Sequence, residues 1–318
     1  MLVATVFVII RMEKLMSAVL MMGFFSLLSS CIFMVLDAVD VAFTEAAVGA
    51  GASTIFFLAA IAIVGRTSKP TSNKNALMPL LVVVCTGIVL IYATFDMPYF
   101  GNPAAPIHQH VAPRYLTESA EEVGPPNVVT SVLASYRGYD TFGEVGVVFT
   151  AFIGVFLLLG AGTRRSGIER PAPPNVGVES MRQNIVLREV SDLVIAPVLI
   201  FGLYVQWHGD FGPGGGFQAG VIFASGIILY ALIYGIVPAQ KLLPPRKLAY
   251  LPAVGLLLYA AVGVYSMLNG GNFLDYNLVA EDPHDGQHYG ILIIELGVGI
   301  TVAAVMVNIF FSFSERSL

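Results

Sequence analysis

The chain has 318 residues, of which 56% are hydrophobic and only 12% are charged. Soluble domains carry about 25% charged residues, so this composition excludes a water-soluble protein and indicates an integral membrane protein. The net charge of -5 at pH 7 argues against nucleic acid as a partner.

Apolar segments bounded by polar or Pro/Gly-rich residues predict an all-α, polytopic membrane protein with about nine transmembrane helices. If residue 1 lies outside, 14 of the 16 Lys and Arg residues fall on the inner side, leaving only Arg114 and Arg137 outside. The positive-inside rule therefore favours an N-out, C-in orientation. The expected helices span residues 2–10, 15–37, 46–64, 77–95, 142–162, 189–207, 217–236, 248–267 and 289–311.

Two polar segments divide the chain. Residues 96–141 form a long outer segment with several prolines, and residues 163–186 form an inner linker rich in proline and charge. A self-contained four-helix unit follows the linker. The chain thus has the organisation of small membrane proteins fused end to end.

The first candidate site is DAVDVAFTEAAVGAGAS, residues 37–53, at the outer turn before the third expected helix. It contains Asp37, Asp40 and Glu45, and Gly49 shares a helix face with Glu45. Small residues allow a neighbouring helix to approach closely, so Glu45 could be buried against it and exchange protons. The alternative is that these acids are hydrated groups at a helix N-terminus, which the helix dipole favours.

The second candidate is YRGYDTFGEVGVVF, residues 136–149. Arg137 could pair with Asp140 or with Glu144, which lie three and seven residues further along. Thr141 and Glu144 could instead form a capping box, which is a purely structural role. The functional interpretation places Glu144 inside the membrane as a protonatable or Na⁺-coordinating carboxylate, because hard cations prefer oxygen ligands.

The third candidate is the segment from His208 to Gly235. Pro213, Gly214, Gly215, Gly216 and Phe217 predict a turn or unwound stretch, which near a membrane survives only under protein or beside a wet cavity. Small residues at 212, 216, 220 and 224 predict a tight helix contact. His208 and Asp210 could relay protons, although a plain hairpin with hydrated side chains explains them equally well.

Glu295 is the deepest charge, inside the apolar segment ILIIELGVGITVAAVMVNIFF. A charge in hydrocarbon is costly and usually marks an ion or proton route. The loop before it is rich in Asp, Glu and His, but their spacing matches no metal motif, so we expect a cation-attracting mouth and no bound metal. The candidates for the ion or proton path are Asp37, Asp40, Glu45, Asp140, Glu144, His208 and Glu295.

The three motifs together resemble the signatures of three known families. DAVDVAFTEAAVGAG is similar to the D-x-x-D-V-A-x-T-E-A-x-V-G-A-G signature of the MbhD-like domain, although Val39 stands where proline is common. YDTFGEVGVVF resembles the D-T-x-G-E-x-x-V motif of the MbhE-like domain, and GPGGGFQAG resembles the P-G-G-G-F-x-x-G segment of the MrpB (MnhB) family. The implied units are 1–75 (MbhD-like, three helices), 76–170 (MbhE-like, two helices with a long outer loop) and 171–318 (MrpB/MnhB-like, four helices).

The resemblance implies a membrane subunit of a multi-subunit Mrp-type antiporter in a bacterial inner membrane. Such a complex exchanges Na⁺ or another monovalent cation for protons and needs no cofactor. The implied partners are large antiporter-like subunits of the MrpA and MrpD type, small membrane subunits and the lipid bilayer. Glu45 and Glu144 correspond to the intramembrane acids of the family, and Pro213 to Phe217 correspond to a structural and functional element.

Two further hypotheses remain at this point. The same units could belong to a hydrogenase-like (Mbh/Mbs-type) respiratory ion-pumping complex, or the chain could be a scaffold whose acids are only caps and surface charges. The large antiporter domain carries lysines within its membrane helices, whereas the lysines of this chain fall in loops or at helix ends. We therefore expect a transporter subunit that is not active alone, and no enzyme, because no nucleophile–base pair is recognisable.

Overall fold

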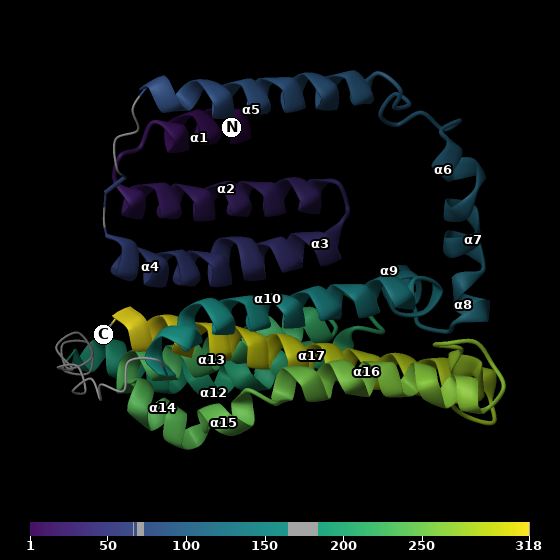
Figure 1. The fold of residues 1–318 in the computed structure, drawn as a ribbon. Coiled ribbons are helices and arrows are strands. Elements are labelled where there is room, and N and C mark those ends of the chain that lie inside the picture. Colours follow the sequence, from purple (N-terminus) through teal and green to yellow (C-terminus); the bar gives the residue numbers. More distant parts are fainter. Residues whose placement is uncertain (66, 69–72, 165–183, 318) are drawn as a thin grey trace.

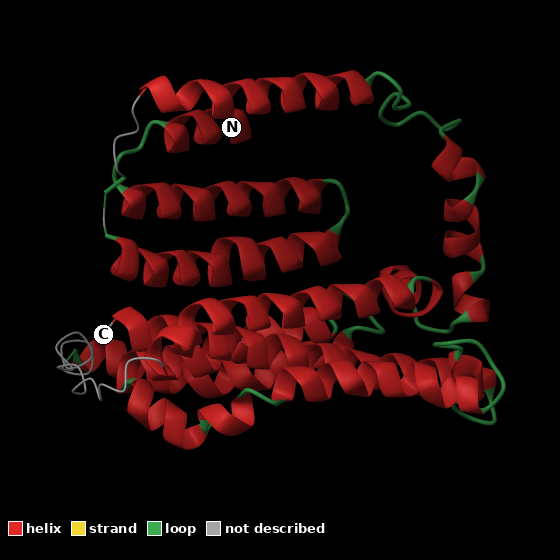
Figure 2. Ribbon diagram, in the orientation of Figure 1, coloured by secondary structure: helices red, strands yellow, loops and turns green. Residues whose placement is uncertain are grey.

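The computed structural model describes residues 1–65, 67–68, 73–164 and 184–317. Across these residues the fold is all-α, without a β-strand, as the sequence predicts (Figure 2). The helices run side by side in layers, and a connection of short helices joins the two sides of the molecule (Figure 1). Most of the linker at 163–186 lies outside the described residues.

The first unit contains α1 (Leu2–Ile10), α2 (Leu15–Val35) and a third rod. The chain reverses at Asp37, whose φ of 60° is left-handed. The third rod consists of α3 (Val39–Thr44), the π-helix η1 (Glu45–Ala52) and α4 (Ser53–Val64). A π-helical stretch is rare and often occurs at functional sites, and η1 coincides with the Glu45 motif.

The second unit begins with α5 (Asn73–Thr94), an apolar helix whose described side chains are almost all exposed. The outer segment is not one loop. It contains α6 (Pro106–Gln109), α7 (Val111–Thr117), α8 (Ser119–Glu122), α9 (Val128–Thr130) and the π-helix η2 (Ser131–Tyr136). Proline at the first position of α6 has a fixed φ that suits a helix start, so prolines here begin helices as well as interrupt them. α10 (Gly138–Arg164) completes this unit.

The last unit is built around one long helix, α17 (Pro283–Ser317), which packs against α13, α16 and α10. It contributes buried residues to both hydrophobic core clusters, and Ile291, Ile294 and Val302 are nearly inaccessible. The remaining elements are α12 (Ile185–His208), α13 (Gly216–Tyr234), α14 (Ile236–Leu242), α15 (Pro245–Leu248), α16 (Leu251–Leu268) and the 3₁₀ turn η3 (Tyr276–Leu278).

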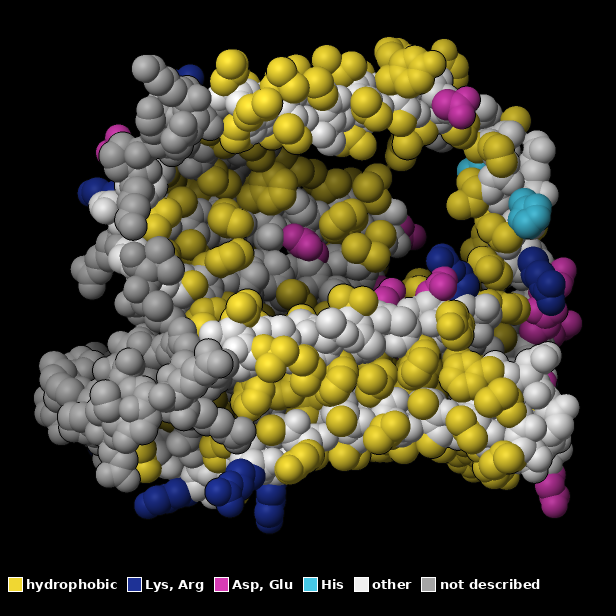
Figure 3. All heavy atoms as spheres, in the orientation of Figure 1, with side chains coloured by type: hydrophobic (Ala, Val, Ile, Leu, Met, Phe, Trp, Pro, Cys, Tyr) yellow, Lys and Arg dark blue, Asp and Glu magenta, His cyan; other side chains and the backbone are white. Residues whose placement is uncertain are grey.

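Seven helices among the described residues are long and apolar enough to cross a membrane. Two of the nine expected spans do not meet this criterion: α1, which has nine residues, and α12, whose first half carries Arg188, Glu189 and Asp192. The count of nine and the N-out, C-in orientation therefore stay predictions. Large hydrophobic side chains cover much of the surface (Figure 3), as expected for a multi-pass membrane protein.

A polar cluster holds the outer segment together. Arg114 contacts the carboxylate of Glu122 at 2.8 Å, and the hydroxyl of Tyr136 donates a hydrogen bond to the same carboxylate. Hydrogen bonds from Arg114 and Tyr136 lower the pKa of Glu122 below its ordinary value of 4.5. Burial and the hydrogen bond to Glu122 raise the pKa of Tyr136 to about 12.

This cluster predicts an acid-sensitive outer segment. Because the folded-state pKa of Glu122 is lowered, its stabilisation is fully present above pH 4.5 and is lost as pH falls through the lower folded-state value. Hydrogen exchange of residues 111–136 should therefore accelerate as the pH is lowered below 4.5, after correction for the intrinsic exchange rate. In Glu122→Gln this pH dependence should be flat, and an unchanged profile in that variant would contradict the assignment.

Candidate functional site

The turn between α12 and α13 folds back tightly on α12. The backbone N–H of Gly215 donates to the carbonyl of Val205 at 3.0 Å, and Gly215 has a φ of 99°. This is a left-handed conformation that glycine adopts without steric cost. A Cβ atom on Gly214 would lie 2.8 Å from the same carbonyl. The predicted glycine-rich turn is thus a compact loop that requires glycine at two successive positions.

The helix that follows packs directly on α17. A Cβ atom on Gly216 would overlap the carbonyl oxygen of Glu295, and one on Gly220 would lie 2.8 Å from the carbonyl oxygen of Gly299. Of the small residues predicted to form a close contact, Gly216 and Gly220 face α17, where the two backbones touch, whereas a Cβ atom on Gly212 would lie 3.1 Å from Nε2 of His208. This contact sets the position of the Glu295 backbone relative to the turn.

The Glu295 carboxylate packs against two glycines at the turn. A Cβ atom on Gly209 would lie 2.9 Å from Oε2, and one on Gly215 would lie 2.9 Å from Oε1. Protein surrounds the side chain on most sides, yet part of it stays accessible. A side chain at either glycine would displace the carboxylate, so the motif creates the space that Glu295 occupies.

An acid–histidine pair lies near Glu295. Asp210 follows Gly209 at the end of α12, and its Oδ2 contacts Nδ1 of His288 on α17 at 2.8 Å. The Asp210 side chain is 13% exposed and the His288 side chain is 49% exposed. The pair thus connects the surface with the interior next to Glu295.

Residues of the first two units also contact the turn between α12 and α13. The Asp40 carboxylate of α3 interacts with the backbone N–H of Gly214 and the side chain of Asn127. The Asn127 amide also donates to the carbonyl of Gly212 at 3.1 Å, and the Thr130 hydroxyl donates to the carbonyl of Gly209 at 2.6 Å. We call Asp40, Asn127, Asp210, His288 and Glu295 the junction cluster, because all three units meet there.

A hydrogen bond between α13 and α3 also holds the last unit against the first unit. The side-chain amide of Gln218 on α13 donates to the hydroxyl of Thr44 on α3 at 2.9 Å. Gln218 is 9% exposed, and a buried amide needs such a partner. The Thr-Glu pair of the first motif is thereby held against the helix that carries the third motif.

The junction cluster contains three carboxylic acids and a single basic side chain, His288. The charges of Asp40 and Asp210 both act on Glu295, and in the described part of the chain the only ion pair of these acids is the one with His288. Repulsion between close carboxylates is relieved by a proton or a bound cation. No group of three or more His, Cys, Asp and Glu side chains among the described residues could hold a metal ion.

Glu45 faces α2, inside the first unit. It begins η1, is half-buried, and its Oε1 lies against Gly49, where a Cβ atom would be 2.7 Å away. The hydroxyl of Ser26 on α2 lies equally close to that position. The shared face predicted for Glu45 and Gly49 is thus present, and it faces α2.

Glu144 is exposed on α10 and acts electrostatically, as Glu295 does, on the fully buried Tyr259 of α16. Asp140 pairs with Arg137 at 2.6 Å on the exposed outer end. The capping-box interpretation is wrong: α10 already begins at Gly138, and the Thr141 hydroxyl donates to the carbonyl of Leu133 at 2.8 Å.

Two other candidates lie apart from the junction cluster. His208 stacks on Tyr204, with ring centroids 4.9 Å apart, and its Nδ1 is 3.3 Å from the Tyr204 hydroxyl. Asp37 is exposed in the turn before α3. The structure thus brings Asp40 and Glu295 together, and it leaves Asp37, Asp140 and His208 at the periphery.

The sequence analysis did not identify the Asp210–His288 pair or the role of Asn127. Asp210 and His288 are 78 residues apart, and Asn127 precedes Asp210 by 83 residues, so no local spacing relates them. The available signal was the position of Asp210 directly before the glycine-rich turn.

Comparison with known families matches the three units in order. The family model of MbhD, the D component of MBH, matches residues 1–66, and the model of MbhE, the E component of MBH, matches residues 76–183. The model described as a domain related to the MnhB subunit of Na⁺/H⁺ antiporter matches residues 186–308. The putative antiporter subunit mnhB2 of Staphylococcus aureus is 35% identical over 138 residues, which are 42% of this chain and 97% of that protein.

The chain belongs to the Mrp-type antiporter subunit family. MbhD, MbhE and MnhB units are fused in this one member. A probable K⁺/H⁺ antiporter subunit of the A/B type from Rhizobium meliloti is 25% identical over 97% of this chain, and this chain spans 33% of that relative.

Two solved structures are similar to the fused subunit. The Mrp complex from Dietzia has a chain with a TM-score of 0.76 and 23% identity, covering 98% of this chain and 34% of that one, which shows the shared fold. A chain of the membrane-bound sulfane sulfur reductase, an archaeal respiratory membrane complex, has a TM-score of 0.55 and 28% identity, covering 75% of this chain and 97% of that one.

Proposed function

We propose that the fused subunit provides the cation path of a multi-subunit Mrp-type antiporter that exchanges Na⁺ or another monovalent cation for protons. The complex lies in a bacterial inner membrane. Its other members are large antiporter-like subunits of the MrpA and MrpD type and small membrane subunits. The transported cation and the proton are cargo, and the subunit holds no resident cofactor.

The observation that carries this proposal is the place of Glu295. Glu295 belongs to a long apolar helix, and its carboxylate packs against a glycine-lined turn with Asp40 and Asp210 close by. An enclosed acid among other acids is costly unless a proton or a cation binds there. A scaffold gains nothing from this arrangement, whereas an ion path needs it.

The surrounding residues suggest an order of events. A cation or proton arrives at the Asp210–His288 pair, because the exposed acids Glu281, Asp282 and Asp285 that precede His288 in the chain attract cations. It passes to Glu295. Both Glu295 and Glu144 act electrostatically on Tyr259, a buried hydroxyl that donates to the carbonyl of Gly138 at 2.7 Å. Glu45 and Glu144 then connect the path to neighbouring helices or subunits.

Purification of the tagged chain from its native membrane, with identification of the co-purified subunits by mass, tests this assignment. We expect antiporter-like subunits, together with Na⁺-dependent proton release from vesicles that carry the complex. Iron–sulfur subunits would instead assign the chain to a respiratory ion pump, which the similarity to the sulfane sulfur reductase chain makes the second candidate. Unchanged antiport after deletion of the gene would contradict the antiporter role.

A further inference from the structure

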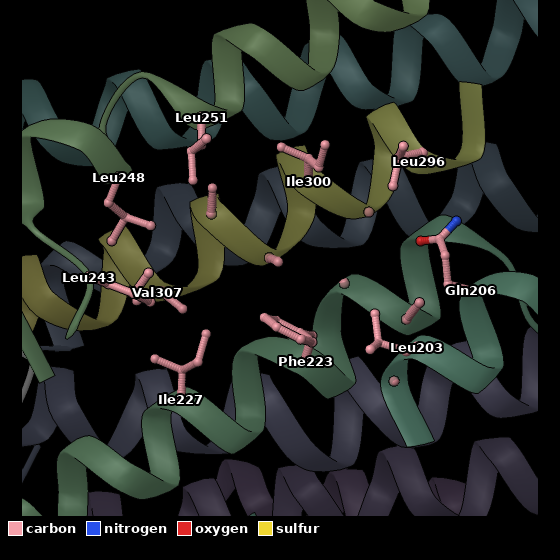
Figure 4. A pocket seen from close by; sticks show the side chains of 16 residues that line it. Leu203, Gln206, Phe223, Ile227, Leu243, Leu248, Leu251, Leu296, Ile300 and Val307 are labelled. Carbon is pink, nitrogen blue, oxygen red and sulfur yellow. The ribbon is translucent and has the colours of Figure 1, made fainter. Parts of the chain in front are cut away.

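An apolar groove of about 280 Å³ runs along α17 on the side of α12, α13 and the start of α16 (Figure 4). Gln206 is the single polar side chain among its 16 lining residues. The groove extends from Leu296 and Gln206 at one end to Val307, Leu243 and Leu248 at the other (Figure 4). Leu203, on its wall, is 52% exposed, so the groove opens toward the surrounding bilayer.

The length of the groove fits one leaflet of a membrane. Leu296 and Val307 are 11 residues apart on the same helix, which corresponds to roughly 16 Å at a rise of about 1.5 Å per residue. Half of a hydrocarbon core that is about 30 Å thick is about 15 Å. The groove therefore runs from the membrane surface to about the middle of the bilayer.

The surface end of the groove is positively charged. The short helices α14 and α15 supply Leu243 and Leu248 to the groove or its edge, and they also carry Lys241, Arg246 and Lys247, which are exposed. Blue side chains gather over these two helices in Figure 3. None of the ion pairs within the described residues involves the three cations. Such charges do not remain in hydrocarbon, so α14 and α15 lie at the membrane surface.

We propose that the groove binds one acyl chain of an anionic phospholipid, whose phosphate is held by Lys241, Arg246 and Lys247. An apolar slot of one leaflet length selects an acyl chain, and juxtamembrane basic residues select an anionic headgroup. The lipid stabilises the folded subunit by binding it preferentially. This proposal does not depend on the transport role, because it uses no residue of the junction cluster.

The headgroup part is tested by native mass spectrometry of the full chain, titrated with phosphatidylglycerol and with phosphatidylcholine. Arg246→Gln/Lys247→Gln should bind phosphatidylglycerol roughly ten- to thirtyfold more weakly and phosphatidylcholine unchanged. The matched control Arg11→Gln/Lys14→Gln removes one Arg and one Lys from the other end of the chain. Equal losses in both variants, or equal wild-type affinity for the two lipids, would overturn headgroup recognition.

The acyl-chain part is tested by filling the groove. Ala303 is half-buried and lines the groove, so Ala303→Leu should remove the one-to-one lipid adduct. Ala261→Leu adds the same volume at an exposed position of α16 and should leave the adduct intact. Elution volume and helical circular dichroism establish that both variants fold. Retained lipid in Ala303→Leu, or a partner protein cross-linked into the groove of the wild-type complex, would overturn the proposal.

Discussion

Replacement of Glu295 by glutamine is expected to reduce cation-dependent proton exchange by about a hundredfold or more, since a positioned proton-transferring side chain contributes roughly 10²–10⁴-fold. Glutamine has nearly the same shape as glutamate and fits the space above Gly209 and Gly215. It carries no charge and releases no proton, so the subunit should assemble normally while transport fails. The measurement is the recovery of a pH gradient in inverted vesicles after addition of Na⁺.

The matched control for this variant is Glu281→Gln. Glu281 is exposed in the loop before α17, so its loss should change the exchange rate by much less than the loss of Glu295. Asp210→Asn should give an intermediate defect, because it removes the partner of His288 but leaves Glu295 in place. Full exchange activity in Glu295→Gln, with a normally assembled complex, would favour the scaffold interpretation.

Gly216→Ala is expected to be the most destabilising glycine-to-alanine change among the described residues. The new Cβ atom would overlap the Glu295 carbonyl oxygen on α17, and the obstacle is backbone, which cannot rotate away. Overpacking of a close-packed contact costs about 1–3 kcal/mol, occasionally more, and we expect the upper end of this range. Thermal unfolding of the detergent-purified chain, followed by size-exclusion fluorescence, measures the effect.

Gly146→Ala provides the comparison in the same protein. Gly146 lies within α10, and no atom lies within 4 Å of its built Cβ position. Alanine there should be neutral or stabilising by up to about 1 kcal/mol, from helix propensity alone. If the two variants melted at the same temperature, the close α13–α17 contact would not be the reason for the glycine.

Much of the fold follows from sequence because bilayer-spanning helices need long apolar stretches. The expected span at 217–236 corresponds to α13, Gly216–Tyr234, and the one at 15–37 to α2, Leu15–Val35. The exceptions have local causes. α17 begins at Pro283, six residues before the expected start. The prediction placed the start too late because a polar first turn carries no hydropathy signal. The short helices of the outer segment were not predicted for the same reason, because short polar helices have no apolar periodicity to detect.

Composition and the spacing of small residues were enough to establish the membrane class and to predict the glycine-rich turn with its close packing, and the resemblance of three motifs to known families implied the three fused units. These properties are local, so each can be recognised without a fold. Which acids meet became clear from the three-dimensional packing, which placed Asp40 and Glu295 at one junction with Asp210, His288 and Asn127 and left His208 against Tyr204. The physical reason is that side chains on different helices meet through packing, and the packing here depends on where glycines let α13 touch α17.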